Sequence, residues 1–220
     1  MKLACMPFLA PITIVAMLFQ SSAFAVEYRS PTRELCHPGL NGQHGCPGRV
    51  ADEEDALEPG RSLPALDIQA GGVISVHDNS IVETPWSSKS LESRGRVQLV
   101  QYVAANRRAL GQNKPFTTAL LEKKFSSEKI DTTIIVHMAD TMPIAKGLVV
   151  NKMAKKKAKH QAVKFVIDDQ GVGLERWGMK HKSFAVIVLD ANGKVLFAKD
   201  GPLSEIEIES TISLIESQMI

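Results

Sequence analysis

Two apolar runs separated by about thirty residues constrain the fold of this 220-residue chain more than any other feature. "RVQLVQYVA" (96–104) and "TTIIVHMAD" (132–140) are continuous apolar segments, typical of strands that are buried on both faces. Between them, "PFTTALLEKKF" (115–125) starts with a proline and predicts one helix. Its apolar residues fall on one side: Phe116, Leu120, Leu121 and Phe125. Two strands joined through a helix predict a parallel crossover unit.

The C-terminal part predicts an antiparallel hairpin closed by a helix. "SFAVIVLDANGKVLFAKDG" (183–201) has β-branched and apolar runs on both sides of Asn192-Gly193, a pair that favours the left-handed turn of a hairpin. Ser204 and Glu207 then form a capping box, the signature of a helix start. The following apolar stripe consists of Ile208, Ile212, Ile215 and Met219.

Three more segments complete the predicted domain. "GGVISVHD" (71–78) is read as a short strand after a Gly-Gly turn, and "AVKFVIDDQG" (162–171) as a further extended segment. "PIAKGLVVNKMAKKKAKHQ" (143–161) predicts another helix. Its expected apolar side consists of Leu148, Val149 and Met153.

The predicted order is that of a thioredoxin-like α/β fold, with a central mixed sheet flanked by helices. The chain most closely resembles the YtfJ family, exported bacterial proteins of the thioredoxin superfamily without an established activity. Four stretches carry the resemblance: "GRVQLVQYVA", "TTIIVHMAD", "FVIDDQGVGLERWG" and "AVIVLDANGKVLFAKDGPLSEIE". The domain is therefore expected over residues 61–220.

Residues 1–25 have the composition of a cleaved signal peptide. "MKLACMPFLAPITIVAMLFQSSAFA" contains one lysine, an uncharged apolar stretch and a terminal Ala-x-Ala. We therefore expect export to the periplasm and no stable membrane insertion after cleavage. Residues 26–60 form an irregular Gly/Pro-rich and acidic segment outside the family resemblance.

The resemblance also shows what the reactive position of this chain lacks. Thioredoxin-like oxidoreductases carry a cysteine pair where the central strand leads into the helix, and a cis-proline before the terminal hairpin. Here "AANRRALG" (104–111) contains no cysteine, and Ser183 stands in the proline's place. This excludes thiol–disulfide exchange at that position and leaves Asn106, Arg107 and Arg108 as candidates, with Ser183, for binding an anion or a partner's carboxylate. The alternative is that both arginines are solvated and that Asn106 closes the turn.

The N-terminal segment contains the two cysteines that remain after signal cleavage, Cys36 and Cys46. An even pair in an exported chain indicates a structural disulfide. A metal site is the alternative, because two thiolates can join His37 and His44 in a tetrahedral zinc or copper shell. A redox-active pair is a third interpretation.

Other functional classes find little support. The formal charge of +2 gives no general argument for nucleic acid, and no aromatic residues accompany the lysines between Lys152 and Lys159, which read as a solvated helix face. No phosphate loop, Ser-His-Asp order or cofactor motif is evident. The leading hypothesis is a redox-inactive binding or structural module for an unknown protein or small-anion ligand. A redox or metal-handling protein acting through the cysteine pair comes second, and a hydrolase or transferase with unidentified residues third.

Overall fold

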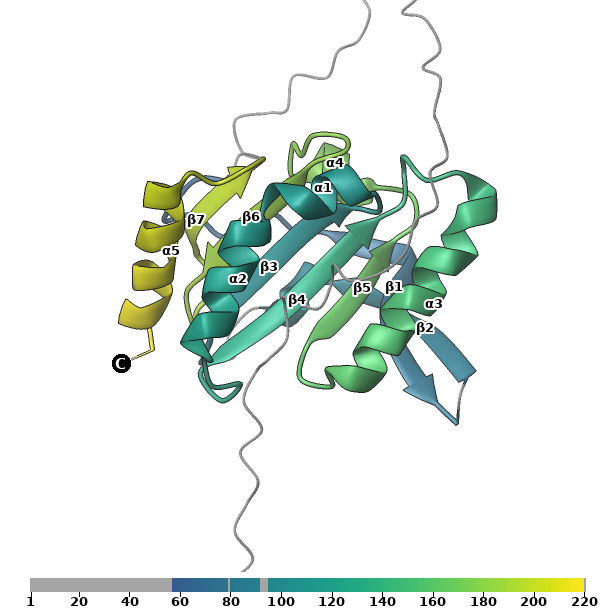
Figure 1. Ribbon diagram of the computed structural model, residues 1–220, viewed down its shortest axis with the longest axis horizontal. Helices are drawn as coiled ribbons and strands as arrows, with labels where there is room; N and C mark the ends of the chain where they lie inside the picture. The colour runs from purple at the N-terminus through teal and green to yellow at the C-terminus, as the bar shows by residue number, and fades with distance from the viewer. Residues whose placement is uncertain (1–56, 79, 92–94, 220) are drawn as a thin grey trace, which may run out of the picture.

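The computed structural model describes residues 57–78, 80–91 and 95–219 (Figure 1). This part of the chain forms a seven-stranded mixed sheet with helices on both faces. The strands are β1 (Asp67–His77), β2 (Ser80–Ser87), β3 (Val97–Ala104), β4 (Ile130–His137), β5 (Lys164–Asp168), β6 (Phe184–Leu189) and β7 (Val195–Asp200). The helices are α1 (Arg107–Gln112), α2 (Lys114–Lys123), α3 (Pro143–Lys159), α4 (Val172–Arg176) and α5 (Glu205–Ser217), with a 3-10 turn at Ser88–Leu91.

The strand order is β2-β1-β5-β4-β3-β6-β7. β3 pairs in parallel with β4, and β4 with β5, whereas the remaining neighbours are antiparallel. All eight residues of β3 are buried, as the unbroken apolar run predicts for a strand covered on both faces. The predicted parallel crossover and the thioredoxin-like α/β class are confirmed.

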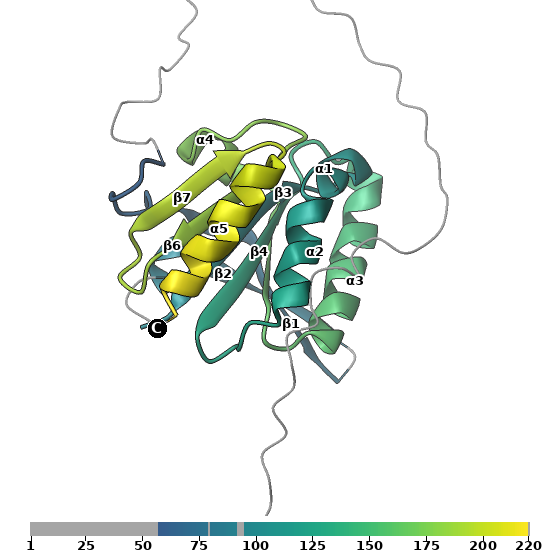
Figure 2. The same cartoon turned by 60° about the vertical axis from the view of Figure 1, so that its left-hand side comes forward.

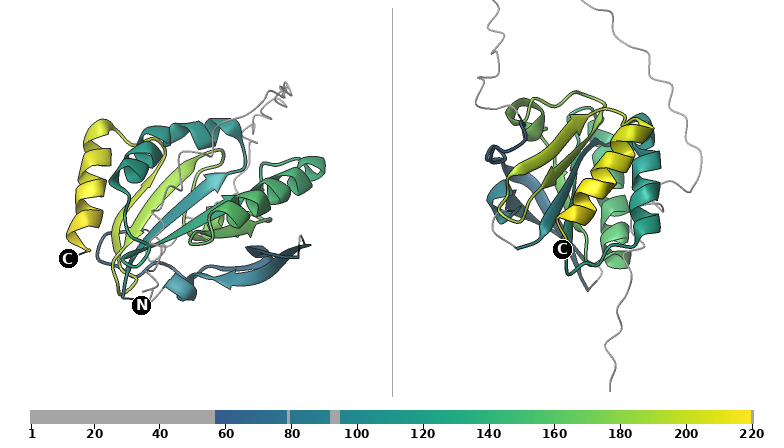
Figure 3. Two further views of the ribbon diagram at one scale, coloured as in Figure 1. Left: turned by 60° about the horizontal axis from the view of Figure 1, so that its bottom comes forward. Right: turned by 90° about the vertical axis from the view of Figure 1, so that its left-hand side faces the viewer.

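Two hydrophobic cores lie on opposite faces of this sheet. One contains Phe116 of α2, Met153 of α3 and Ile212 of α5, so these three helices cover the same face. In the right-hand view of Figure 3 they stand together on one side of the strands. The other core contains Leu174 and Trp177 at α4, together with Leu66 and Trp86 from the N-terminal part of the described chain.

The C-terminal hairpin and helix also agree with their sequence signals. β6 and β7 pair antiparallel around a turn in which Gly193 has a φ of 82°. Ser204 caps α5 through the complete capping box with Glu207. Ile208, Ile212 and Ile215 are buried and Met219 is partly buried, so the predicted stripe faces the sheet.

The N-terminal hairpin differs from the prediction. Gly71 and Gly72 do not precede the strand but lie inside β1, where the register with β2 shifts. A Cβ on Gly72 would lie 2.0 Å from the carbonyl oxygen of Thr84, so only glycine permits this approach. β2, with Pro85, is an edge strand that the sequence reading missed.

The helices contain three further differences. The single helix expected between β3 and β4 is two helices, divided at Asn113. The short α4 was not predicted. Leu148, expected on the apolar side of α3, is 66% exposed, whereas Met153 is buried as predicted. Among the described residues, no helix is both long and apolar enough to span a membrane.

Several predictions fall outside the described residues. These are the signal peptide over residues 1–25, almost all of the irregular segment over residues 26–60, and every site residue within it. That last group comprises Cys36, His37, His44 and Cys46. The disulfide and the alternative metal site therefore stay predictions.

Candidate functional site

The candidate site lies where β3 ends and α1 begins. Asn106 is the N-cap of α1, and its side-chain oxygen accepts a hydrogen bond of 2.8 Å from the backbone N–H of Ala109. The sequence analysis placed Arg107 and Arg108 before a helix that starts near Pro115. In the structure they form the first turn of the additional helix α1. α1 has only six residues, and its side chain at Ala109 is buried.

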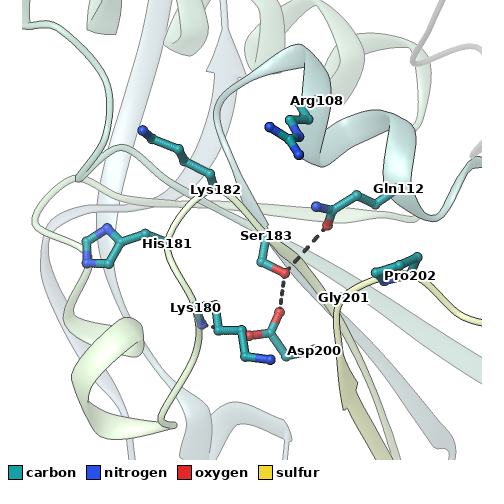
Figure 4. A pocket seen from close by; sticks show the side chains of 9 residues that line it. All are labelled: Arg108, Gln112, Lys180, His181, Lys182, Ser183, Asp200, Gly201 and Pro202. Carbon is teal, nitrogen blue, oxygen red and sulfur yellow. Dashed lines mark hydrogen bonds between the residues drawn. The ribbon is translucent and has the colours of Figure 1, made fainter. Parts of the chain in front are cut away.

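An open pocket of about 340 Å³ adjoins α1 (Figure 4). Three segments line it: Arg108 and Gln112 from α1, residues 180–183 before β6, and residues 200–202 at the end of β7. The sheet brings these segments together, because Ser183 directly precedes β6 and its carbonyl oxygen accepts a hydrogen bond of 2.9 Å from the backbone N–H of Ala104 at the end of β3. The pocket therefore lies at the strand-to-helix position that the sequence analysis singled out.

Asp200 organises the floor of this pocket. One of its carboxylate oxygens accepts a hydrogen bond from the buried Ser183 hydroxyl, and the other accepts a bond of 2.6 Å from the backbone N–H of Lys180. Gln112 lies on the opposite side of Ser183, with its side-chain oxygen 3.5 Å from the hydroxyl (Figure 4). Asp200 thus fixes the loop while its own charge is engaged in these bonds.

The rim of the pocket is cationic. Arg108 and Lys180 are exposed, and neither side chain has a hydrogen bond or ion pair within the described part of the chain. Lys182 adds a third positive charge and has a φ of 56°, a backbone conformation uncommon for a residue with a side chain. Its backbone N–H donates to Asp140, which holds the loop in this conformation. The two exposed cations Arg108 and Lys180 outnumber the engaged carboxylate of Asp200, which favours an anionic ligand.

Asp140 also binds His181, at 2.9 Å from the ring Nδ1. Burial raises the pKa of Asp140, but the hydrogen bonds from His181 and from the Lys182 N–H outweigh burial and leave the pKa below its usual value. In Figure 4 the His181 ring points to the side of the pocket, away from Ser183. Asp140 therefore holds the loop through the His181 ring and the Lys182 N–H.

Of the four residues that the sequence predicted for an anion site, two line the pocket and two do not. Arg108 and Ser183 line one pocket, as their candidate roles require. Asn106 caps the helix, and Arg107 is outside the lining although it has interactions of its own. Sequence reasoning missed Lys180, Lys182 and Asp200, which have no motif and meet only through the pairing of β6 with β7.

Asn113, which the sequence reading also missed, ties the surrounding segments together. This side chain is 1% exposed. Its amide nitrogen donates to the carbonyl oxygens of Phe184 (3.0 Å) and Gly201 (2.9 Å), and its oxygen accepts from the backbone N–H of Leu203 (2.9 Å). One side chain at the junction of α1 and α2 therefore joins the start of β6 to the loop after β7.

A second group of buried polar side chains lies on the face of the sheet that α4 covers. The Tyr102 hydroxyl donates to Asp168 at 2.9 Å, and the same carboxylate accepts from the backbone N–H groups of Val172 and Gly173 at 2.9 Å each. Burial, followed by the charge of Asp168, raises the pKa of Tyr102. His137 stacks on Tyr102, with ring centroids 5.2 Å apart and an angle of 11° between the planes.

We expect His137 to make the protein less stable in mild acid. Burial lowers the pKa of His137, with Asp140, Asp168, His181 and Asp200 as its charged neighbours. Its ring nitrogens have no hydrogen-bond partner among the described residues. As the pH falls below about 6.5, the unfolded chain takes up the proton first, so stability is lost with a slope of at most about 1.4 kcal/mol per pH unit.

Urea unfolding at several pH values between about 7.5 and about 5.5 measures this loss of stability. His137→Phe keeps the aromatic stack and should flatten the decline. His77→Gln, a change at an exposed histidine at the end of β1, is the control. Parallel pH curves for the native protein and His137→Phe would show that His137 is not responsible.

The described part of the chain shows neither a serine activated by a histidine nor a cluster of metal ligands. No hydrogen bond joins Ser183 to a histidine there, because the hydroxyl donates to Asp200 and His181 binds Asp140. Residues 57–78, 80–91 and 95–219 also contain no cluster of three or more histidine or carboxylate side chains that could hold a metal ion. Ionic binding is what the pocket's geometry supports.

Comparison with known proteins places the chain in a family. The model of a bacterial protein family of unknown function, YtfJ_HI0045, matches residues 57–218. The chain belongs to the YtfJ family. An uncharacterized protein of Haemophilus influenzae is 33% identical over 160 residues, which is 72% of this chain and 85% of that protein. The uncharacterized protein YtfJ of Escherichia coli K12 is 28% identical over 160 residues, covering 73% and 86%.

Solved structures resemble this YtfJ-family chain more distantly. A thiol-disulfide isomerase from Corynebacterium glutamicum is 10% identical with a TM-score of 0.48, over 71% of this chain and 96% of that one. The exposed lipoprotein thioredoxin of Streptococcus pneumoniae is 14% identical with a TM-score of 0.43, over 66% and 99%. None of the three cysteines of the chain lies in residues 57–218, the part matched by the family model.

Proposed function

We propose that this YtfJ-family protein is an exported, redox-inactive binding module whose pocket between α1 and β6 takes an anionic group of a protein or small-molecule ligand. The observation that carries the proposal is the pairing of Arg108 with the Ser183 loop at one pocket. Where a thiol would have to stand for disulfide exchange, this chain presents a guanidinium group.

The cations of the pocket support an oxyanion as the recognised group. Arg108 offers a planar set of N–H donors that matches a carboxylate or phosphate, and Lys180 and Lys182 add positive charge. Ser183 and Gln112 provide polar atoms at the base. A ligand held in this way is bound and oriented without any covalent step.

Export to the periplasm is the second part of the proposal. It is supported by the signal-peptide composition of residues 1–25. N-terminal sequencing of the protein from its native host should find Val26 as the first residue if cleavage follows Ala25. A full-length protein starting at Met1 would contradict export by this signal.

Arg108→Ala should abolish stabilisation by oxyanions. An oxyanion at about ten times its dissociation constant should raise the unfolding free energy by about 1.4 kcal/mol, or the melting temperature by about 4 °C. Melting in sodium phosphate and in sodium acetate is compared with melting in sodium chloride of equal ionic strength. Arg108→Ala should then melt equally in all three salts, because the bidentate donor is gone.

Arg107→Ala is the matched control for this measurement. It removes the same side chain one position earlier on α1, outside the pocket lining, and should keep the phosphate and acetate effects. Equal loss in both variants would indicate a general charge effect instead of a site. Absence of any oxyanion effect on the native protein would contradict the proposed ligand class.

The cysteine pair is proposed to be a structural disulfide. Mass spectrometry without reductant should find Cys36 and Cys46 linked, about 2 Da lighter than the reduced pair. The purified protein and its Cys36→Ala/Cys46→Ala variant should both leave insulin unreduced in the presence of dithiothreitol, apart from the background rate. Turnover above background that the double variant loses would support the redox alternative. Free thiols with stoichiometric zinc or copper would support the metal alternative, with His37 and His44 as the next residues to replace.

A further inference from the structure

The outward face of α3 is apolar at its start and basic further along. Ile144 is 86% exposed and Leu148 is 66% exposed, although both are large aliphatic residues. Lys155 lies on the same side of the helix, because Leu148 follows Ile144 by four residues and Lys155 follows Leu148 by seven. α3 contains no acidic residue, so no carboxylate on the helix itself balances its lysines.

These lysines also repel one another. Burial lowers the pKa of Lys156, and the neighbouring Lys159 and Lys152 lower it further. Within the described residues, the side chains of Lys152, Lys155 and Lys159 make no hydrogen bond or ion pair. The face therefore has both exposed apolar surface and uncompensated positive charge.

α5 has the complementary composition. Its exposed side begins with Ile206, which is 79% exposed, and Glu209 and Glu216 follow on the flank beside α2. The helix contains no lysine or arginine. Glu209 has no partner among the described residues, whereas Glu216 binds Lys123 at the surface, at 2.7 Å.

The two faces lie at opposite ends of one helical layer. α3 packs on β1 and β5 at one side, α5 lies beside α2 at the other, and the three helices run in the same direction (Figures 1 and 2). A two-fold axis parallel to these helices and above α2 would place α3 of one copy on α5 of its partner. The same operation places α5 on α3, so both complementary contacts form together.

We infer that this protein forms a two-fold symmetric dimer through its helical layer, in which the basic face of α3 contacts the acidic face of α5 of a second copy. The spacing of the residues agrees with this arrangement. Ile144 and Lys155 are eleven residues apart, and Ile206 and Glu216 are ten apart, so both pairs span about 15–17 Å along their helices. In the parallel arrangement that the axis imposes, the apolar N-terminal part of α5 would face that of α3, and their charged C-terminal parts would face each other.

Charge reversal tests this inference by sedimentation velocity on the purified protein at about 0.2 mM in low salt. The native protein should show a concentration-dependent dimer that weakens at high salt. Lys152→Glu/Lys155→Glu on α3 and Glu209→Lys/Glu216→Lys on α5 should each weaken association by roughly tenfold or more, because both contacts become repulsive. An equimolar mixture of the two variants should dimerise again, since each α3–α5 contact in the mixed pair joins opposite charges.

Two further variants separate the apolar contribution from loss of folding. Ile144→Ser/Leu148→Ser should weaken the dimer, whereas Val82→Ser, which changes an exposed apolar residue on β2, should not. Circular dichroism establishes that each variant remains folded. A native protein that stays monomeric, a dimer that the reversals leave unchanged, or variants that fail to associate when mixed would overturn the inference. So would binding of the native monomer to phosphatidylglycerol vesicles that only the α3 reversal removes, because this result would assign the face to a lipid surface.

Discussion

Asn113→Ala is expected to destabilise the domain by about 3 kcal/mol, a decrease in melting temperature on the order of 10 °C. The substitution leaves the carbonyl oxygens of Phe184 and Gly201 and the N–H of Leu203 without their partner in the interior. The Phe184 oxygen keeps only the bond of 3.2 Å from the Gly201 N–H, and each bond lost without regaining water costs about 1 kcal/mol or more. Thermal and urea unfolding measure the effect.

Asn106→Ala is the matched control for Asn113→Ala. Asn106 caps α1 through a single side-chain bond at its partly exposed end, so its loss should cost only about 1 kcal/mol. The hydrogen bonds of Asn113 connect the start of β6 with the loop after β7, and both border the pocket. Asn113→Ala should therefore also remove the oxyanion effect. Equal destabilisation by the two variants would mean that the three bonds of Asn113 contribute no more than one cap.

Asp168→Ala is the second large expected effect, a loss on the order of 4 kcal/mol. Asp168 is fully buried and accepts from the Tyr102 hydroxyl and from the N–H groups of Val172 and Gly173. Without the carboxylate, the Tyr102 hydroxyl on β3 and two N–H groups at the start of α4 remain unpaired, and α4 loses this polar link to the sheet. Gly173 lies against Tyr102 so closely that a Cβ would come within 2.5 Å of the ring, so little movement can compensate.

Asp169→Ala provides the neighbouring comparison. Its carboxylate forms a partly exposed ion pair with Lys146, 2.8 Å long, and its removal should cost less than about 1 kcal/mol. The near-ultraviolet circular dichroism, to which Tyr102 and Trp177 contribute, should change in Asp168→Ala and stay constant in Asp169→Ala. A stable Asp168→Ala protein with native spectra would contradict the role given to this buried carboxylate.

The sequence was sufficient for the parts of the fold with strong local signals. The apolar run of β3 is buried along its whole length, and the capping box of α5 forms as expected. β2 was missed because an edge strand that contains Pro85 has no continuous apolar pattern, and its pairing depends on β1. Leu148 was misplaced because periodicity alone does not show which side of a short apolar cluster meets the sheet.

The candidate site was only half predictable for a similar reason. The resemblance pointed to Arg108 and Ser183, which belong to segments aligned with a known arrangement. Asp200 and Lys180 reach the same pocket through the β6–β7 hairpin and the loop before it, and neither has a local sequence signal. Asn113 reads as an ordinary loop residue until its three buried partners, distant in sequence, are in place.

The most direct test of the proposed binding site is a map of amide chemical-shift changes in the ¹⁵N-labelled protein during titration with phosphate and with acetate, at constant ionic strength. The site predicts saturable changes confined to Arg108, Gln112 and residues 180–183, which Arg108→Ala removes and Arg107→Ala retains. Changes that never saturate, or that gather on the lysines of α3, would contradict the pocket as the oxyanion site.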